Sequence, residues 1–455
     1  MSRLRITALI AAGALAALAV PASAQTIAIV NARIETVSTA GAIASGVVVI
    51  KDGKIVAVGA NVTAPQGATI IDAHGGVVTP GLIAPSTNLG VAEVDLLRST
   101  RDDRAGSALS AGFDVQYGVN PASTLIPLAR LGGVTRAVVT PILGRAGDGS
   151  GDEEGGGGAA ALTGGGSGGS GDPGLFAGQA AIIALAVQNT DPIVRARVAV
   201  ALDLGEAGAA NAGGSRGSAM VLVKSALDDA RNYSHNRSGF EKGAARPYGL
   251  SRVDLEALIP VVEGRTPLLV RVHRASDIRQ VLKLASDEKL KVILEGAEEG
   301  WMVALELAKA GVPVLIDPES ALPNQFETLG SRLDNAARLQ AAGVLVAIEG
   351  SRDFNNLRQE RFNAGTAVAN GMPYAAALAA ITANPARIWG MGEQTGTLAA
   401  GMDADVVVWN GDPLETSSYP LAVIIGGQAQ PMTSRALELR DRYLNPDKSY
   451  PPAYH

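Results

Sequence analysis

The chain has 455 residues, of which 47% are hydrophobic and 18% charged, enough for a sizeable core in roughly two to four domains or one large barrel with an accessory domain. Its formal net charge is −6 and no run of Lys and Arg exceeds two residues, which excludes nucleic acid and anionic membrane surfaces as expected partners. The absence of cysteine excludes disulfides and lipid anchors on cysteine.

The first 24 residues are predicted to be a cleavable secretion signal. Arg3 and Arg5 form a short basic region, residues 6–20 are apolar, and residues 22–24 form an A-x-A cleavage site. The apolar stretch is shorter than the ~20 residues that a membrane-spanning helix needs, and no other segment is a better candidate. We therefore expect export to a bacterial periplasm, without membrane insertion.

Two β-rich segments flank the middle of the chain. Residues 26–37 and 46–62 are rich in Val and Ile, and the second stretch contains Asp52-Gly53, a pair typical of a type I′ hairpin turn between alternating runs. Residues 68–83 add a third strand region, and residues 396–413 and 421–430 have a similar composition. We predict one small composite β-sandwich domain built from both chain ends, residues 25–80 and 391–436. A C-terminal tail, residues 437–455, is expected to follow it.

The middle of the chain alternates short apolar runs with helical patterns. Apolar runs that end in polar residues are typical of buried parallel strands, and they occur at residues 133–141, 197–205, 267–274, 291–299, 312–319 and 343–350. Helical patterns lie between them, at residues 276–289, 299–310 and 374–389. With a first strand at 77–83, this rhythm predicts an α/β fold, a closed (β/α)8 TIM barrel over residues 81–390 whose fourth strand has no secure position.

A Gly- and Ser-rich segment of low complexity interrupts this pattern at residues 144–174. Such a segment cannot bury enough apolar surface to offset its ordering entropy, so it predicts a disordered surface insertion. The alternative is a phosphate-binding loop, but the G-x-x-x-x-G-K-[ST] motif is missing.

Several motifs resemble the amidohydrolase superfamily, and within it the imidazolonepropionase-like branch. "GVVVIKDGKIVAVG" and "IIDAHGGVVTPGLI" resemble the N-terminal module of that branch, and residues 377–415 are similar to its closing helix and β return. Residues 271–315 resemble its fifth and sixth strands with their helices. The resemblance extends over essentially the whole mature chain. It implies a TIM barrel with a composite β-sandwich, and hydrolysis of carbon–nitrogen bonds with one or two divalent metals such as Zn²⁺.

The metal-ligand positions that this resemblance implies hold other residues here. The first-strand histidine pair falls on Ser86 and Asn88, and the fifth-strand His-x-His falls on Arg271 and His273. The sixth-strand histidine falls on Gly296. A catalytic metal needs several imidazole or carboxylate ligands if it is to lower the pKa of a bound water. We therefore expect no metal cofactor.

The remaining ligand positions are also altered. The eighth-strand aspartate falls on Ser351, with Asp353 two residues away, and Lys224 lies in a helical pattern where the fourth-strand lysine is sought. His273 and Asp353 are the only candidates for residual metal ligands, and Asp353 and Glu349 are the catalytic candidates of an altered hydrolase. Oxygen ligands for Mg²⁺ or Ca²⁺ could also come from carboxylates at strand ends, which could equally cap loops or form ion pairs: Asp203, Glu295, Asp317 and Glu349.

The expected binding residues are Ser86, Asn88, Arg271 and His273. Arg271 carries a permanent charge and five donors, so it opposes a metal and could hold the carboxylate of an anionic ligand; alternatively, Glu295 or Glu349 pairs with it. Three other histidines are expected to be exposed bystanders, namely His74, His235 and His455. Residues 213–217 match the G-x-S-x-G nucleophile elbow, but a loop precedes them where a strand is required.

These observations predict an exported protein with an amidohydrolase fold whose metal-dependent catalysis is lost. Its expected role is that of a small-molecule binding protein or a partner subunit, in a homo-oligomer or with an intact amidohydrolase. The alternative is an active amidohydrolase with a relocated or atypical metal site. Fold alone does not decide between the two roles, and metal content separates them.

Export gives a direct test. We expect the mature protein to begin at Gln25 and to be recovered in the periplasmic fraction, because the basic region, apolar stretch and cleavage site occur in the order that a signal peptidase requires. N-terminal sequencing of the purified protein checks this. Recovery of folded protein that retains residues 1–24 would contradict it.

Overall fold

The computed structural model describes residues 26–94, 97–106, 109–143, 174–188, 190–244, 246–350 and 356–444. The secretion signal, Ser351, Asp353 and His455 lie outside these ranges, as does the Gly-rich insertion up to residue 173. What the sequence predicts for them stays a prediction.

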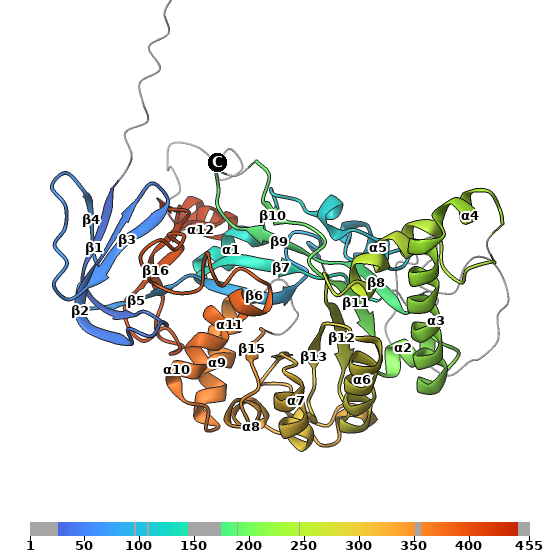
Figure 1. Ribbon diagram of the computed structural model, residues 1–455. Coiled ribbons are helices and arrows are strands. Elements are labelled where there is room, and N and C mark those ends of the chain that lie inside the picture. Colours follow the sequence, from blue (N-terminus) through green and yellow to red (C-terminus); the bar gives the residue numbers. More distant parts are fainter. Residues whose placement is uncertain are drawn as a thin grey trace, which may run out of the picture.

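An eight-stranded sheet combines strands from both ends of the described chain (Figure 1). The strand order is β18-β17-β16-β5-β1-β2-β3, and β4 pairs with β1. The β2–β3 turn has positive φ angles at both Asp52 (53°) and Gly53 (76°), which confirms the type I′ hairpin. That this sheet forms a separate β-sandwich domain stays a prediction. The strands are β1 (Ile27–Glu35), β2 (Ala42–Lys51), β3 (Lys54–Gly59), β4 (Thr69–Asp72), β5 (Val77–Pro80), β16 (Val406–Trp409), β17 (Pro420–Ile425) and β18 (Gln428–Ala429).

Two further sheets contain the strands of the middle of the chain. In the first, ordered β10-β9-β7-β6, β6 and β7 run parallel; in the second, ordered β15-β14-β13-β12-β11-β8, strands β11 to β15 run parallel in chain order. Among the described residues no strand pairing joins the two sheets, so barrel closure stays a prediction. The strands are β6 (Leu82–Thr87), β7 (Val134–Val139), β8 (Phe176–Gln179), β9 (Ala181–Ala184), β10 (Ile193–Arg195), β11 (Val200–Asp203), β12 (Leu268–Val272), β13 (Val292–Gly296), β14 (Val314–Ile316) and β15 (Val346–Ile348).

Most helices follow the strands of these two sheets (Figure 1). They are α1 (Leu125–Leu131), α2 (Glu206–Asn211), α3 (Arg216–His235), α4 (Arg237–Glu241), α5 (Arg252–Val262), α6 (Ala275–Glu288), α7 (Ala304–Ala310), α8 (Asn335–Ala341), α9 (Glu360–Ala369), α10 (Tyr374–Ala380), α11 (Ala383–Ile388) and α12 (Arg435–Leu444). Short 3₁₀ helices occupy Arg98–Thr100, Val115–Gly118, Gly300–Val303, Phe326–Thr328 and Leu357–Gln359. No described helix is both long enough and apolar enough to cross a membrane.

The helical pattern at residues 374–389 forms two helices, not the single one predicted. Pro385 has no N–H and its ring would clash with the carbonyl of Ile381, so a continuous helix is disfavoured there. The carbonyl of Ile381 instead accepts a hydrogen bond from the backbone N–H of Ile83, at 3.0 Å. The break between α10 and α11 therefore docks this part of the chain onto β6.

A buried arginine joins the composite sheet to the sheet that contains β7. Arg136 on β7 donates from Nε to Asp405 (2.6 Å) and from a terminal guanidinium nitrogen to Asp403 (2.7 Å), both just before β16. Arg136 and Asp405 are buried, so their charges are compensated within the protein. This ion pair fixes the closing β return against the strands of the middle of the chain.

The alternation of side chains along three neighbouring strands orients the polar residues at their carboxyl ends. Ala201, Leu269 and Ile293 belong to one buried apolar cluster with Trp389. Side chains two residues apart share a face of a strand. The residues two positions further along, Asp203, Arg271 and Glu295, are paired in register and point the same way, which resolves the strand face of Glu295.

Candidate functional site

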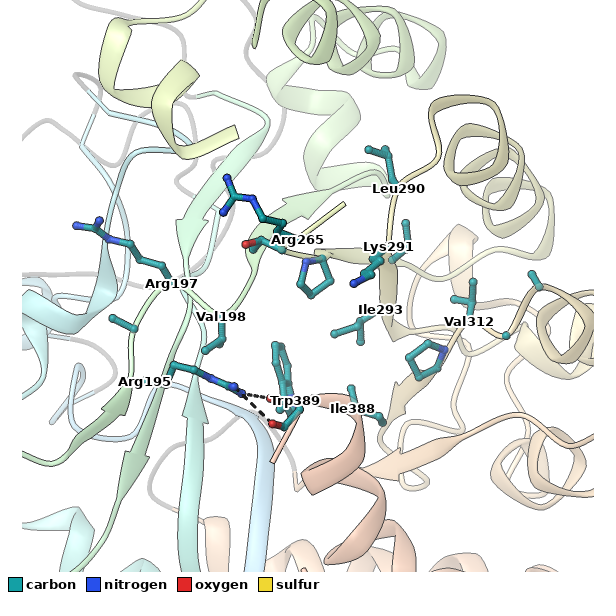
Figure 2. Close-up of a pocket in the computed structure, with 18 residues that line it drawn as sticks. Arg195, Arg197, Val198, Arg265, Leu290, Lys291, Ile293, Val312, Ile388 and Trp389 are labelled. Carbon is teal, nitrogen blue, oxygen red and sulfur yellow. Dashed lines mark hydrogen bonds between the residues drawn. The ribbon is translucent and has the colours of Figure 1, made fainter. Parts of the chain in front are cut away.

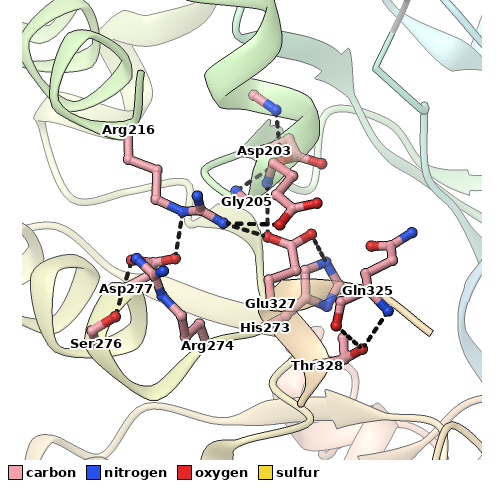
Figure 3. Close-up of polar contacts among 12 residues, drawn as sticks. Asp203, Gly205, Arg216, His273, Arg274, Ser276, Asp277, Gln325, Glu327 and Thr328 are labelled. Carbon is pink, nitrogen blue, oxygen red and sulfur yellow. Dashed lines mark hydrogen bonds and ion pairs between the residues drawn. The ribbon is translucent and has the colours of Figure 1, made fainter. Parts of the chain in front are cut away.

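A cavity of about 710 Å³ lies at the carboxyl ends of β11, β12 and β13. Strand ends and the loops that follow them supply its walls, as expected for parallel strands whose carboxyl ends meet at one edge. Figure 3 shows part of its polar lining around His273. The lining residues are Asp203, Glu206, Ala207, Ala210, Asn211, Arg271, His273, Glu298, Ser320, Leu322, Asn324, Gln325, Glu327 and Thr328.

A buried ion pair between Arg271 and Glu295 lies beneath this cavity. Arg271 Nε donates to Glu295 Oε2 at 2.7 Å, and the two side chains are 7% and 3% exposed. A terminal nitrogen of Arg271 also donates to the carbonyl of Pro141 at 3.0 Å. Of the two roles weighed for Arg271, the structure shows the internal pair with Glu295. The guanidinium of Arg271, which was expected to bind the carboxylate of a ligand, is paired with the carboxylate of Glu295.

Ser86 and Asn88 form hydrogen bonds with other buried side chains near this ion pair. Ser86 Oγ donates to Glu295 Oε1 at 2.8 Å and lies 2.7 Å from Thr140 Oγ1. Asn88 Nδ2 donates to Asp103 Oδ2 at 3.2 Å. Of the four expected binding residues, Arg271 and His273 line the cavity, whereas Ser86 and Asn88 are not among its lining residues.

His273 lies between two carboxylates at the cavity wall. Its Nδ1 is 2.6 Å from Glu298 Oε2, and its Nε2 is 3.8 Å from Glu327 Oε1. Burial opposes protonation of the ring, but the hydrogen bond and charge of Glu298, with the charges of Glu327 and Asp203, outweigh it and raise the pKa of His273 to about 9. The imidazole is therefore protonated at neutral pH, whereas a metal ligand must be neutral.

Two glycines make room for this ring. Gly296 has φ +92°, and a Cβ there would lie 2.7 Å from His273 Nδ1. A Cβ on Gly205 would lie 2.8 Å from Glu327 Oε2 and 3.2 Å from His273 Cδ2. Any side chain at position 296, where the resemblance implies a histidine, would displace the His273 ring. The observed position of the His273 ring therefore requires glycine at position 296.

Carboxylates dominate the charge of the cavity wall. Asp203 Oδ1 accepts from the backbone N–H groups of Gly205 and Gly208, and so orders the start of α2. Glu327 Oε2 accepts from the backbone N–H of Glu206 at 2.7 Å and from Arg216 at 3.0 Å. The lining contains four carboxylates against two cationic side chains, so its charge does not favour the expected anionic ligand: Asp203, Glu206, Glu298 and Glu327 against Arg271 and His273.

Glu298 and Glu327 are site residues that the sequence reasoning missed. Glu298 lies at the polar end of the predicted strand region 291–299. Its position at a strand end is therefore the feature from which the sequence could have predicted it. Glu327 lies in a 3₁₀ helix within the long β14–α8 connection, where no periodicity distinguishes one polar residue from another. Only the path of that connection brings it to His273.

The other strand-end carboxylates lie outside the cavity lining. Asn363 Nδ2 donates to Asp317 Oδ1 at 2.8 Å and to the carbonyl of Glu349 at 3.1 Å. Burial raises the pKa of Asp317 to about 6. Glu349 is buried at the end of β15, while its neighbour in the prediction, Asp353, is outside the described residues.

The remaining candidates have ordinary structural positions. His74 and His235 are exposed. Ser215 is the N-cap of α3 and accepts from the backbone N–H of Ser218, so it does not lie on a strand-to-helix elbow. Lys224 lies within α3.

The donor set at the carboxyl ends of the strands does not fit the divalent metal that the resemblance implies. Within the described ranges no three His, Cys, Asp or Glu side chains come together as a metal-binding group. At the expected ligand positions stand a guanidinium paired with Glu295, a hydrogen-bonded hydroxyl and a glycine. Arg271 and protonated His273 have no lone pair to offer a metal, and each lies against a carboxylate that could otherwise serve as a ligand.

The fold and the position of the cavity define an α/β protein with a polar site at the carboxyl ends of parallel strands. Residues 276–433 match the sequence profile of the Amidohydrolase family. An amidohydrolase from Thermotoga maritima is similar in structure, with a TM-score of 0.74 and 22% identity, over 89% of this chain and 99% of that one. Molinate hydrolase is similar with a TM-score of 0.50 and 18% identity, over 94% of this chain and 98% of that one. These likenesses indicate a TIM-barrel-like fold.

Two relatives are similar in sequence over shorter stretches. The amidohydrolase tasK of Hapsidospora irregularis is 52% identical over 60 residues, and the imidazolonepropionase of Aromatoleum aromaticum is 40% identical over 119 residues. These matches cover 13% and 24% of this chain, and only 6% and 28% of the respective relatives. Together with the profile match over residues 276–433, they show that parts of this chain are similar in sequence to members of the amidohydrolase superfamily, and the structural likeness shows a common fold. The family reaction is the hydrolysis of carbon–nitrogen bonds.

The Arg271–Glu295 pair predicts a large loss of stability when Arg271 is removed. In Arg271→Ala, Glu295 is left as a buried charge without its cation, which we expect to lower the free energy of unfolding by about 3–5 kcal/mol. Arg279→Ala, which breaks an exposed pair with Glu306, serves as the matched control and should lower the free energy of unfolding far less, because solvent screens that pair. Urea denaturation measures both. Equal losses in the two variants would show that the buried pair has no special role.

The clamped histidine predicts a pH dependence. Its pKa is raised from 6.5 to about 9 on folding, so the stabilisation is fully present below pH 6.5 and is lost as the pH rises through 9. Across this window, wild type should lose up to about 3 kcal/mol more than His273→Gln in its free energy of unfolding. Asp317 titrates near pH 6 and is common to both proteins, so it cancels in the difference. If the free energy of unfolding depends on pH in the same way in wild type and His273→Gln, the contact with Glu298 does not raise the pKa of His273.

Proposed function

We propose that this chain is an exported, small-molecule-binding member of the amidohydrolase superfamily in which metal-dependent hydrolysis is lost. The observation that carries the proposal is the Arg271–Glu295 ion pair, at 2.7 Å, among the strand ends where the family resemblance implies a metal. A carboxylate that could help to hold a cation is thereby engaged by a side-chain cation. The altered residues at the other ligand positions support the same conclusion.

A guanidinium can replace the charge of a metal but not its chemistry. A metal ion activates a bound water because it is a Lewis acid that lowers the pKa of that water. A guanidinium has five donors, no acceptor and no open coordination position, so it cannot form a hydroxide in this way. Arg271 can therefore stabilise the fold by pairing with Glu295, but it cannot generate the hydroxide that attacks the substrate in a metal-dependent hydrolysis.

The ligand is proposed to carry a positive charge or several hydrogen-bond donors. Four carboxylates line the cavity, and the charge of Arg271 is engaged by Glu295 beneath it. Leu322, 70% exposed, adds an apolar contact at the rim. This differs from the anionic ligand expected from Arg271 in the sequence alone. A partner-subunit role, with a second copy or with an intact amidohydrolase, and export to the periplasm both rest on the sequence.

The second candidate function is an active hydrolase with an atypical site. The observation that favours it is the His273–Glu298 contact of 2.6 Å at the cavity wall. An imidazolium held this way could donate a proton to a leaving nitrogen. A water nucleophile would still need a base, and Asp203 is the carboxylate on the neighbouring strand end.

Metal content and activity test the proposal together. Elemental analysis of the purified full-length chain should find well under one equivalent of Zn²⁺, Mn²⁺ or Fe²⁺, because the ligand positions offer a paired guanidinium, a hydroxyl, an amide and a glycine. A hydrolysis screen on dipeptides and cyclic amides should give no turnover. An amidohydrolase with complete metal ligands, purified in parallel, is the control for metal loss. Stoichiometric metal, together with an activity that His273→Ala removes, would establish the second candidate instead.

A further inference from the structure

A second cavity, of about 620 Å³, lies at the opposite ends of the strands, where β11 to β14 begin. Pro267, Lys291 and Pro313, which immediately precede β12, β13 and β14, form part of its wall. The residues at the end of α11 form another part, including Trp389 (Figure 2). The parallel arrangement that brings the carboxyl ends together at the first cavity also brings these amino ends together. The two cavities share no lining residue.

The charged residues in this wall are all cationic. Arg195, Arg197, Arg265 and Lys291 line the cavity, and no acidic side chain is among its lining residues. Arg197 points away from the other labelled residues in Figure 2 and pairs with Asp114 at 2.7 Å. Arg265 Nε donates to Glu263 at 2.9 Å. In the described part of the chain, neither Arg195 nor Lys291 has an acidic partner.

Arg195 is held in place by backbone carbonyls. Its terminal nitrogens donate to the carbonyl oxygens of Trp389 and Gly390, as the dashed lines in Figure 2 show. These neutral acceptors order the guanidinium without cancelling its charge. Lys291 is an exposed residue at the start of β13, and its ammonium group is free to meet a ligand. The cavity therefore presents one fixed and one adaptable cation.

The rest of the wall is apolar. The indole of Trp389 contributes to it, and the residue is only 3% exposed. Its Nε1 has no hydrogen-bond acceptor among the described residues, which is unfavourable for a buried donor. Aliphatic and proline side chains provide most of the remaining surface: Val198, Pro267, Leu290, Ile293, Val312, Pro313 and Ile388.

We propose that this cavity binds an organic anion with an apolar body, of which a medium-chain carboxylate is the simplest form. The carboxylate would pair with Lys291 and Arg195, and the chain would lie against the aliphatic wall and the Trp389 indole. Burial of the apolar body adds a favourable contribution that an inorganic anion cannot gain. The charge of this cavity is opposite to that of the first, so the two select different ligands. The proposal is independent of the function proposed for the carboxyl ends of the strands.

Octanoate is the probe, titrated into the full chain by isothermal calorimetry. We expect saturable binding of one octanoate per chain, at least about tenfold weaker binding of the neutral isostere octanamide, and no saturable binding of inorganic phosphate. Lys291→Glu should weaken octanoate binding at least about tenfold, since an attraction becomes a repulsion. Arg265→Ala is a second variant in the same wall and should weaken it less.

Two matched variants control for net charge and for the other cavity. Lys51→Glu makes the same charge change at an exposed residue of β2, outside the cavity lining, and His273→Gln alters only the first cavity. Both should bind octanoate as wild type does. Absence of saturable binding, or equal affinity of the Lys291→Glu and Lys51→Glu variants, would overturn the proposal. Equal affinity for octanamide would refute the role of the cations, and phosphate binding as tight as octanoate would refute that of the apolar wall.

Discussion

The buried ion pair between Arg271 and Glu295 is the interaction around which the carboxyl ends of the strands are arranged. The two residues are partners in register on β12 and β13, directly beyond the apolar layer that contains Leu269 and Ile293. In such a position either charge alone would be costly, so each requires the other. The Ser86 hydroxyl and the Pro141 carbonyl satisfy further donors and acceptors of the pair. The interior of this site is thus completed by the protein's own side chains.

The residues around the pair follow from it. Glu295 pairs with Arg271, so it is not one of the carboxylates beside His273. Those carboxylates belong to Glu298 and Glu327, which lie in the connections after β13 and β14. The ring then occupies the space above Gly296, which excludes a side chain there.

The same strands present opposite charges at their two ends. Carboxylates outnumber cations in the cavity at the carboxyl ends, whereas the charged residues that line the cavity at the amino ends are all cationic. The apolar layer that contains Ile293 and Trp389 separates the two cavities, and Trp389 and Ile293 also line the second one. Elsewhere a second buried ion pair, between Arg136 and Asp405, ties the composite sheet to β7. A barrel-like fold can therefore carry two chemically distinct surfaces with a common core.

Local sequence patterns predicted most strands of the fold and two of the residues that line the first cavity, Arg271 and His273. Runs such as residues 267–274 and 291–299 contain β12 and β13, because buried parallel strands leave a local, continuous apolar pattern. The resemblance likewise led to the expectation that Ser86 and Gly296 stand at metal-ligand positions of the family. Tertiary structure decided which groups meet: Ser86 and Glu295 are 209 residues apart, and Arg271 had two possible partners until the strand register selected one. Glu327 and the cationic cavity are absent from any local pattern, because contacts between distant segments depend on how strands and connections pack, and no single stretch of chain encodes that.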